Sequence, residues 1–373
     1  MTENPALSLN IDMKAVAANY RIIGSHLAEG ATAAAVVKDD AYGLGMLECS
    51  RAFHQEGCRF FFVATLDEAL EFRQAFPDWP VAVLHGFGGA QTSSALKPYI
   101  QNNLIPVLNT LHEVHLWQSA AAETDSLQPA ILHVDTGMHR LGLSPEEFRQ
   151  FQQQRSGFSA IRFLYVMSHL ACADTPDHAM NEMQWQNFYH AKTQLRDLPG
   201  CFANSAGIFY DPKFHCDLVR PGAALYGLQV SPRQPEMQPC LFLTAPILQI
   251  QTLKKGDAVG YGATWHSAKD ETILATIPLG YAHGYLRSFS SREQDGNAFV
   301  YCHGIKSPVV GRVSMDLVTV DISAAAEQTK CGDRVEILGR HQTADALAAD
   351  AGTIGYEILT GLGKIAPRRY NEI

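Results

Sequence analysis

The feature of this sequence that most limits its fold is an alternation of short apolar runs with longer amphipathic segments through the first two-thirds of the chain. Short continuous apolar runs are typical of strands that are buried on both faces of a parallel sheet. We expect eight such strands, at Ala33–Lys38, Arg59–Thr65, Val81–Gly86, Ile105–Asn109, Ala130–Asp135, Ile161–His169, Cys201–Ser205 and Leu218–Gly222. Eight strands alternating with helices over this length predict an α/β fold with a closed (β/α)8 barrel of the TIM type.

Helical periodicity separates most of these apolar runs. The expected helices are Met13–Ala28, which precedes the first strand, and Leu66–Phe76, Leu111–Ala121, Pro145–Gln153 and Ala179–Leu198. The alternative arrangement is an open, doubly wound sheet, which commonly carries a GxGxxG turn after its first strand. No such turn follows Ala33–Lys38, so the barrel is the favoured fold.

The pattern changes after about residue 240, where strand-like runs follow one another without helices between them. These runs are Leu243–Leu253, Asp257–Tyr261, Thr272–Leu279, Ala298–His303, Val309–Val313, Leu317–Ile322 and Arg334–Leu338. They predict a C-terminal, mostly antiparallel β domain, closed by short helices near Asp345–Ala351 and Tyr356–Leu362. The proline-rich stretch Val230–Pro239 is expected to link the domains, which we therefore place at residues 1–236 and 237–373.

Composition excludes several classes of function. The formal net charge of -9, with no cluster of Lys or Arg, argues against nucleic-acid binding, which requires a basic surface. No apolar stretch approaches the roughly 20 residues of a membrane span, and the polar N-terminus does not resemble a secretory signal. The eight cysteines form no CxxC pair, so neither a metal site nor a disulfide framework is indicated. A cytoplasmic protein without a metal is expected.

Function in a barrel of this type is concentrated at the carboxyl ends of the strands. The polar residues expected there are Lys38, Arg140, His169, Asn204, Ser205 and Arg220. A lysine at the end of an apolar run is suited to covalent chemistry with an aldehyde cofactor, although an ion-paired or partly exposed lysine is the alternative. The segments Asn204–Gly207 and Pro221–Ala223 are either phosphate-binding backbone or ordinary turns. Together, the amine, the phosphate-binding backbone and the arginine favour pyridoxal phosphate.

Nine segments, in order along nearly the whole chain, resemble the alanine racemase family. They are AVVKDDAYGLG from Ala35, VDTGMHRLG from Val134, MSHLACAD from Met167, ANSAG from Ala203, LVRPGAALYG from Leu218, VGYGATW from Val259, IPLGYAHGYLR from Ile277, VGRVSMD from Val310 and YEILTGLG from Tyr356. The resemblance implies an isomerase that uses pyridoxal 5'-phosphate to interconvert L-alanine and D-alanine. It also implies a homodimer in which each C-terminal domain contributes a catalytic tyrosine to its partner's site.

The resemblance assigns roles to individual residues. Lys38 attaches the cofactor and serves as one base, while Tyr261 is the second base, on the opposite face of the cofactor. A phenol has a reference pKa of about 10, so Arg140 beside it should favour the phenolate, with His169 in the same network. Arg220 should bind the pyridine nitrogen, which it cannot protonate. The remaining implied residues are Tyr42, Asn204, Ser205, Gly222, Ala223 and Tyr356 for cofactor binding, and Arg140, Met315, Asp316 and Tyr281 for substrate binding, with Asp174 also at the entrance.

The sequence departs from the family pattern in three places, the first of which covers two residues. Asp39 and Asp40 follow the lysine where Asn or Ala is usual, and we expect them to point away from the cofactor. His283 stands where the family usually has Asp. His133 stands where many members have a carbamylated lysine that orients the arginine; because histidine cannot form the carbamate, we expect a neutral His133, a water or an anion to meet Arg140. The alternative is that the change at this position is silent.

Proteins with the same fold can have other functions. One is a racemase for another amino acid, such as serine or lysine, because the motifs specify the chemistry more firmly than the substrate. Another is a non-catalytic carrier of pyridoxal phosphate, but such proteins lack the β domain and its tyrosine. A decarboxylase for basic amino acids has a different second-domain signature. Supply of D-alanine for peptidoglycan is the expected role, with catabolism or synthesis of a specialised product as alternatives.

Overall fold

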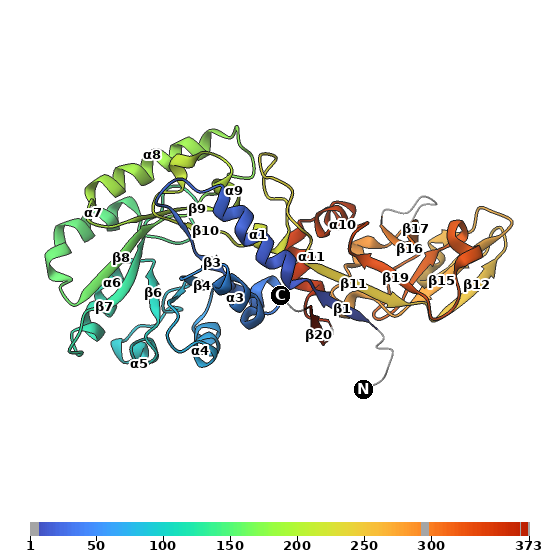
Figure 1. The fold of residues 1–373 in the computed structure, drawn as a ribbon, viewed down its shortest axis with the longest axis horizontal. Coiled ribbons are helices and arrows are strands. Elements are labelled where there is room, and N and C mark those ends of the chain that lie inside the picture. The colour runs from blue at the N-terminus through green and yellow to red at the C-terminus, as the bar shows by residue number, and fades with distance from the viewer. Residues whose placement is uncertain (1–6, 292–297, 366, 372–373) are drawn as a thin grey trace.

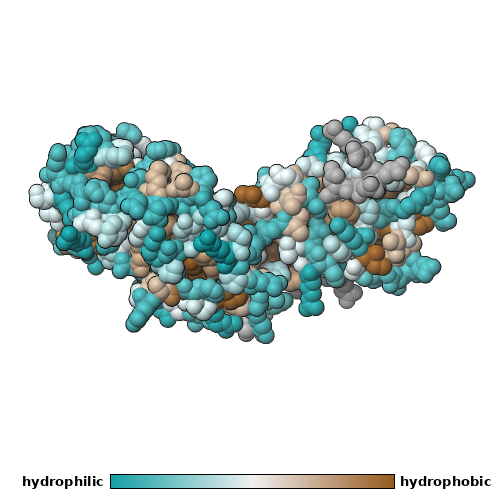
Figure 2. Space-filling view, turned by 90° about the horizontal axis from the view of Figure 1, so that it is seen from above, coloured by the Kyte–Doolittle hydropathy of each residue, from teal (hydrophilic) through white to brown (hydrophobic). Residues whose placement is uncertain are grey.

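The computed structural model describes residues 7–291, 298–365 and 367–371. The chain forms a parallel barrel surrounded by helices and, at one side of it, a second sheet that is mostly antiparallel (Figure 1). In the space-filling view these parts appear as two lobes with a hollow between them (Figure 2). This arrangement confirms the predicted fold class.

The barrel is closed by a strand that is interrupted at Ala34. Its two parts, β2 (Thr32–Ala33) and β3 (Ala35–Val36), pair in parallel with β10 on one side and β4 on the other. The remaining strands, parallel and in order around the barrel, are β4 (Phe61–Val63), β5 (Val81–Val83), β6 (Ile105–Leu108), β7 (Gln128–His133), β8 (Ile161–Met167), β9 (Gly200–Asn204) and β10 (Leu218–Arg220). Each of the eight predicted runs overlaps one of these strands, although β7 and β9 begin before the predicted runs Ala130–Asp135 and Cys201–Ser205.

Helices cover the outside of the barrel (Figure 1). They are α1 (Met13–Ser25), α3 (Met46–Gln55), α4 (Leu66–Ala75), α5 (Lys97–Gln101), α6 (Leu111–Ala121), α7 (Pro145–Gln154) and α8 (Ala179–Gln194), with a single turn, α9 (Ser205–Ile208), after β9. Helix α1 ends earlier than predicted, because the side chains of Ser25 and His26 both bind the carbonyl of Ile22. Helix α4 begins with a capping box between Thr65 and Glu68.

The second sheet contains nine strands within the described residues, in the order β12-β15-β18-β17-β16-β19-β11-β1-β20. Their bounds are β1 (Ser8–Ile11), β11 (Leu241–Pro246), β12 (Gln249–Leu253), β15 (Thr272–Ile277), β16 (Phe299–Cys302), β17 (Ile305–Val310), β18 (Val318–Asp321), β19 (Arg334–Leu338) and β20 (Arg368–Tyr370). All neighbours are antiparallel except β1 and β20. Strands β1 and β20 were not predicted; β1 adds a strand from the N-terminal part of the chain to this sheet and pairs with β20.

Three C-terminal predictions were wrong in their bounds. The single run Leu243–Leu253 is two strands, because Pro246 has no N–H to continue the ladder and the chain turns to the far edge of the sheet. The run Asp257–Tyr261 is only β13 (Ala258–Val259), which pairs with β14 (Trp265–His266). Strand β17 lies earlier than predicted and ends before Gly311, whose φ of 74° does not fit a strand. The domain boundary between residues 236 and 237 stays a prediction.

The last helices, α10 (Ala344–Ala351) and α11 (Gly355–Leu362), return the chain to the barrel. Helix α11 contacts α2 (Lys38–Tyr42), the short turn that follows β3. At this contact Gly43 and Gly363 approach so closely that a Cβ on either would overlap backbone atoms. No helix among the described residues is long and apolar enough to cross a membrane.

Tyr226 provides a test of how the closing strand is held. Its buried hydroxyl donates a hydrogen bond of 2.7 Å to the carbonyl of Val36, the last residue of β3. We expect Tyr226→Phe to lower the free energy of unfolding in urea by about 1 kcal/mol, because one buried hydrogen bond is lost. Tyr189→Phe, at an exposed ring, is the control and should leave the free energy of unfolding unchanged. Equal stability losses in the two variants would contradict the assignment.

Candidate active site

Most of the predicted site residues surround one cavity of about 1170 Å³ at the carboxyl ends of the barrel strands. Those that line it are Lys38, Tyr42, His133, Arg140, His169, Asp174, Asn204, Ser205, Arg220, Gly222, Ala223 and Tyr356. The cavity is also bordered by α10 and α11, so the returning C-terminal helices form part of its wall. Among the described residues, no cluster of His, Cys, Asp or Glu is suited to hold a metal ion.

The turn α2, which carries Lys38, has an unusual backbone. Residues Asp39 to Tyr42 all have left-handed dihedral angles, with φ between 52° and 58°. Such a conformation costs roughly 1–2 kcal/mol for each non-glycine residue, so the surrounding structure has to stabilise it. Glu68 accepts a hydrogen bond of 2.6 Å from the Asp39 N–H, and Asp40 accepts one of 2.8 Å from the Met46 N–H.

The two aspartates of this turn have different surroundings. Asp40 forms an ion pair of 2.5 Å with Arg368 of β20 and points away from the cavity, as expected. Asp39, in contrast, lines the cavity, so the expectation that it points away is wrong. The left-handed turn explains the difference, because it places successive side chains on different sides of the loop. Lys38 itself is half-buried, and no carboxylate of the described residues is within ion-pair distance of it.

Arg220 is buried at the end of β10, where it holds three barrel strands together. Its guanidinium donates to the carbonyl of Ser168 at 2.6 Å and to the carbonyl of Cys201 at 3.0 Å. It also lies 3.2 Å from Nδ1 of His169 and 3.0 Å from the sulfur of Cys201. None of these partners is a carboxylate, so the positive charge of Arg220 is not neutralised by the described residues.

Two of the histidines that line the cavity, His133 and His169, are in surroundings that favour the neutral ring. Burial, followed by the charges of Arg220 and Arg140, lowers the pKa of His169 well below its usual value. Burial and the Arg220 charge also lower the pKa of His133 to about 3, an effect that Asp135 opposes and Arg140 reinforces. His133 is almost fully buried, and its Nδ1 lies 2.7 Å from Oδ1 of Asn109. The neutral state expected for His133 is thus what its surroundings favour.

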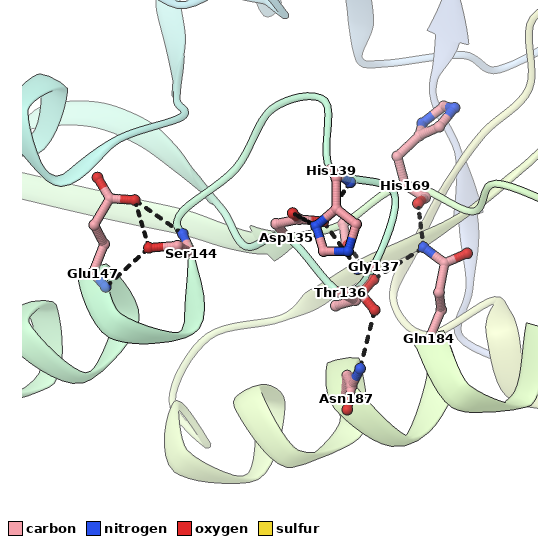
Figure 3. A network of polar contacts seen from close by, with 10 residues as sticks. Asp135, Thr136, Gly137, His139, Ser144, Glu147, His169, Gln184 and Asn187 are labelled. Carbon is pink, nitrogen blue, oxygen red and sulfur yellow. Dashed lines mark hydrogen bonds and ion pairs between the residues drawn. The ribbon is translucent and has the colours of Figure 1, made fainter. Parts of the chain in front are cut away.

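Arg140 belongs to the loop after β7. Asp135 holds the base of this loop (Figure 3). The Asp135 carboxylate accepts hydrogen bonds from the N–H groups of Gly137 and His139, at 2.9 and 3.1 Å. Burial raises the pKa of Asp135, but these bonds and the His139 side chain outweigh that effect and lower it. Across the loop, Gln184 donates to the carbonyl of His169 at 2.9 Å. Arg140 itself is exposed and has no hydrogen-bond partner among the described residues.

The opposite end of the cavity has the features of a phosphate site. The Ser205 hydroxyl lies 2.9 Å from the N–H of Gly222. A Cβ at Gly222 would lie 2.5 Å from the Tyr42 hydroxyl, so only glycine allows this approach. Burial raises the pKa of Tyr42, and burial with nearby Asp174 raises that of Tyr356 to about 12, so both phenols remain proton donors. Backbone N–H groups and phenolic hydroxyls at one end, with Lys38 and Arg220 further in, fit pyridoxal phosphate.

Four predicted residues do not reach this cavity. Tyr261, Tyr281, Met315 and Asp316 belong to the second-sheet part of the chain and are exposed, Tyr261 to 72% and Met315 to 59%. They form one surface patch: the N–H of Tyr281 binds the carbonyl of Ser314, and the glycine after Tyr261 packs on Arg312. His283, beside this patch, has a buried Nδ1 without a partner in the described residues.

Sequence reasoning missed three residues that support the site. Asn109 follows β6 and contacts His133, Glu68 holds the turn after Lys38, and Arg368 pairs with Asp40. Asn109 stands at the carboxyl end of a predicted strand, so the same rule that identified Lys38 could have found it. Glu68 and Arg368 act from a helix and from the end of the chain, where no local pattern indicates a site.

Comparisons with known proteins show the family of this chain. The chain matches the family models "Alanine racemase, N-terminal domain" over residues 11–230 and "Alanine racemase, C-terminal domain" over residues 240–370. It is 40% identical to the catabolic alanine racemase of Mesorhizobium japonicum, with 97% of this chain and 92% of that protein covered. It is 38% identical to an alanine racemase of Rhizobium meliloti, with 97% and 96% covered.

A solved structure shows the same fold. The alanine racemase from Bartonella henselae, described with covalently bound pyridoxal phosphate, superposes with a TM-score of 0.91 at 36% identity, covering 98% of this chain and 100% of that one. The family models, the relatives and the solved structure cover nearly the whole chain. The chain therefore belongs to the alanine racemase family.

Proposed function

We propose that this protein is a pyridoxal-phosphate-dependent racemase that interconverts L-alanine and D-alanine. The chain belongs to the family, and one observation carries the proposal: Lys38, Arg220 and the residues suited to bind a phosphate line the same cavity. When bound, pyridoxal phosphate delocalises the charge that remains after the α-proton of the substrate is removed. Everything else in the reaction depends on residues of the protein.

The residues of the cavity divide into groups that bind the cofactor and groups that move protons. Lys38 would hold the cofactor covalently, and Arg220 would face its ring nitrogen as a donor that cannot give up its proton. The phosphate would be held by Tyr42, Asn204, Ser205, Gly222, Ala223 and Tyr356. Lys38 then exchanges the α-proton on one face of the substrate. A second base is needed on the other face, because an inversion takes the proton from one side and returns it to the opposite side.

We propose that this second base is Tyr261 of another copy of the chain. Among the described residues, the tyrosines that line the barrel cavity are the two assigned to phosphate. Tyr261, Tyr281 and Met315, in contrast, are exposed on the second-sheet part. Exposed aromatic and apolar residues of this kind are typical of interaction surfaces. A two-fold homodimer would place this patch over the cavity of its partner, where Arg140 would hold the tyrosine oxygen and Met315 and Asp316 the substrate carboxylate region.

We also propose a cytoplasmic location. All eight cysteines are free thiols, and five of them are buried as small packing residues. Such usage fits a reducing compartment, in which disulfides do not persist.

The function is tested by incubating the purified, cofactor-loaded protein with L-alanine in deuterated water. Proton NMR should show loss of the α-proton signal, and a chiral separation should show D-alanine. Serine, lysine and arginine, tested in parallel, would identify a racemase for another amino acid if one of them were turned over faster. No exchange with any of the four, in protein that carries the cofactor, would overturn the proposal.

Lys38→Ala provides the first test of the assigned roles. We expect the variant to lose covalent attachment of the cofactor, seen as the absence of the borohydride-stabilised mass increase in intact-protein mass spectrometry. Racemisation should fall by at least about 10²- to 10⁴-fold, the usual contribution of a positioned acid or base. Lys97→Ala, at an exposed lysine of α5, is the matched control and should retain both properties. Covalent attachment at full yield in Lys38→Ala would refute the assignment.

Subunit mixing tests whether the site is shared. Lys38→Ala and Tyr261→Phe should each be nearly inactive alone. When the two variants exchange subunits, half of the dimers should carry one intact site, so about a quarter of the native activity should return. Recovery requires that Lys38 and Tyr261 of one site come from different chains. A mixture that forms mixed dimers, verified by mass, yet stays inactive would show that both residues act within one chain.

A further inference from the structure

Asn109 and His133 form a buried pair that the functions assigned so far do not use. Asn109 directly follows β6, His133 ends β7, and these strands are neighbours in the barrel. Oδ1 of Asn109 lies 2.7 Å from Nδ1 of His133, and both residues are buried, with exposures of 3% and 7%. The histidine ring also lines the cavity. The pair therefore connects the barrel wall to the site.

The orientation of the Asn109 amide is determined by two backbone groups. Its Nδ2 donates to the carbonyls of Leu84 and Val107, each at 3.1 Å. Carbonyl oxygens only accept hydrogen bonds, so the amide nitrogen has to face them and the amide oxygen has to face His133. An amide oxygen also only accepts, so the proton between the two side chains belongs to Nδ1 of His133.

His133 carries no second proton. Its burial and the nearby Arg220 and Arg140 disfavour the charged ring, and Asp135 is the one close group that opposes them. Its Nε2 consequently presents a lone pair. This atom has no partner among the described residues and is not one of the polar atoms that are sealed from solvent, so it opens to the cavity.

His169, on the neighbouring strand end, has the opposite arrangement. Its Nδ1 lies 3.2 Å from the Arg220 guanidinium, which only donates, so Nδ1 of His169 is the unprotonated atom. The proton of the neutral ring is then on Nε2. His133 and His169 are thus both neutral, His133 held as an acceptor at Nε2 and His169 as a donor at Nε2.

We propose that Asn109 is a positioning residue that keeps His133 as a neutral hydrogen-bond acceptor for the guanidinium of Arg140. Arg140 and Lys38 are the cavity cations that lack a side-chain partner in the described residues, and of the two it is Arg140 whose charge acts on His133. Arg220 already donates to three residues. A neutral acceptor orients a guanidinium and leaves its charge intact. A carboxylate in the same place would cancel that charge. The full charge of Arg140 is then left for the anionic groups of the reaction, and this consequence rests on the proposed racemase function.

The tautomer can be measured without any turnover. Long-range proton–nitrogen NMR of histidine-labelled protein distinguishes a protonated from an unprotonated ring nitrogen, and His133→Gln assigns the signal. We expect His133 to be protonated at Nδ1 and neutral across the range in which the protein is stable, and His169 to be protonated at Nε2. In Asn109→Ala the His133 signal should change, while in Asn103→Ala, at the exposed amino-terminal side of β6, it should not. A native His133 that is protonated at Nε2, or charged near neutral pH, would overturn the proposal.

Asn109→Asp tests the functional consequence. A carboxylate at this position favours the charged ring and so raises the pKa of His133, and below that pKa the Nε2 atom carries a proton that faces Arg140. We expect kcat/KM for alanine to fall by about 10- to 100-fold at the acid end of the profile, as for a lost hydrogen bond to a charged group, and to recover as pH rises. Asn103→Asp should follow the native profile.

The possible outcomes separate the two proposals. A variant that is merely destabilised would lose activity at every pH, whereas a charged His133 affects only the acid side. If Asn109→Asp keeps the native profile, the positioning role is refuted and the racemase function stands. If the native protein does not racemise alanine, the proposed function fails, and the NMR measurement still decides the tautomer.

Discussion

The structure of the site depends on one buried cation. Arg220 is almost fully enclosed and binds the ends of β8, β9 and β10 through carbonyl oxygens, a thiol and an imidazole, none of which is negatively charged. An uncompensated charge in a protein interior is costly. Burial, and then this charge, lower the pKa values of His133 and His169, so both rings stay neutral. At the other end of the cavity, the phenols of Tyr42 and Tyr356 and the backbone N–H groups are donors. An anionic phosphate compound fits this environment.

Much of the fold could be predicted from the sequence, because the strands of a parallel barrel have a recognisable sequence pattern. Strands buried on both faces read as short apolar runs, and all eight were found at the observed positions. The second sheet was harder, because its strands are short and one of them, β1, pairs with a segment more than two hundred residues away. The proline at the end of β11 could have shown that Leu243–Leu253 is not one strand.

Site residues that stand at the ends of barrel strands could be predicted from the sequence. Features of the site that depend on contacts between distant segments could not. Lys38, His169 and Arg220 stand directly at those ends, and the family resemblance supplied their roles. The left-handed turn after Lys38 was not visible in the sequence, because it is imposed from outside by Glu68 and Arg368. For the same reason the sequence misplaced Asp39, which lines the cavity. The partnership of Asn109 and His133 required knowing that β6 and β7 are adjacent.

The central claim is that the barrel cavity is completed by the exposed tyrosine of another copy. A photoreactive benzoylphenylalanine in place of Tyr261 tests it directly, in protein assembled from equal amounts of unlabelled and ¹⁵N-labelled chains. After illumination, mass spectrometry of the cross-linked peptides shows whether the two halves of each cross-link come from one chain or from two. The account predicts mixed-isotope cross-links from position 261 to the segment around Lys38–Tyr42 or to residues 134–143. Cross-links confined to peptides of a single isotope would place Tyr261 against its own chain and contradict the shared site.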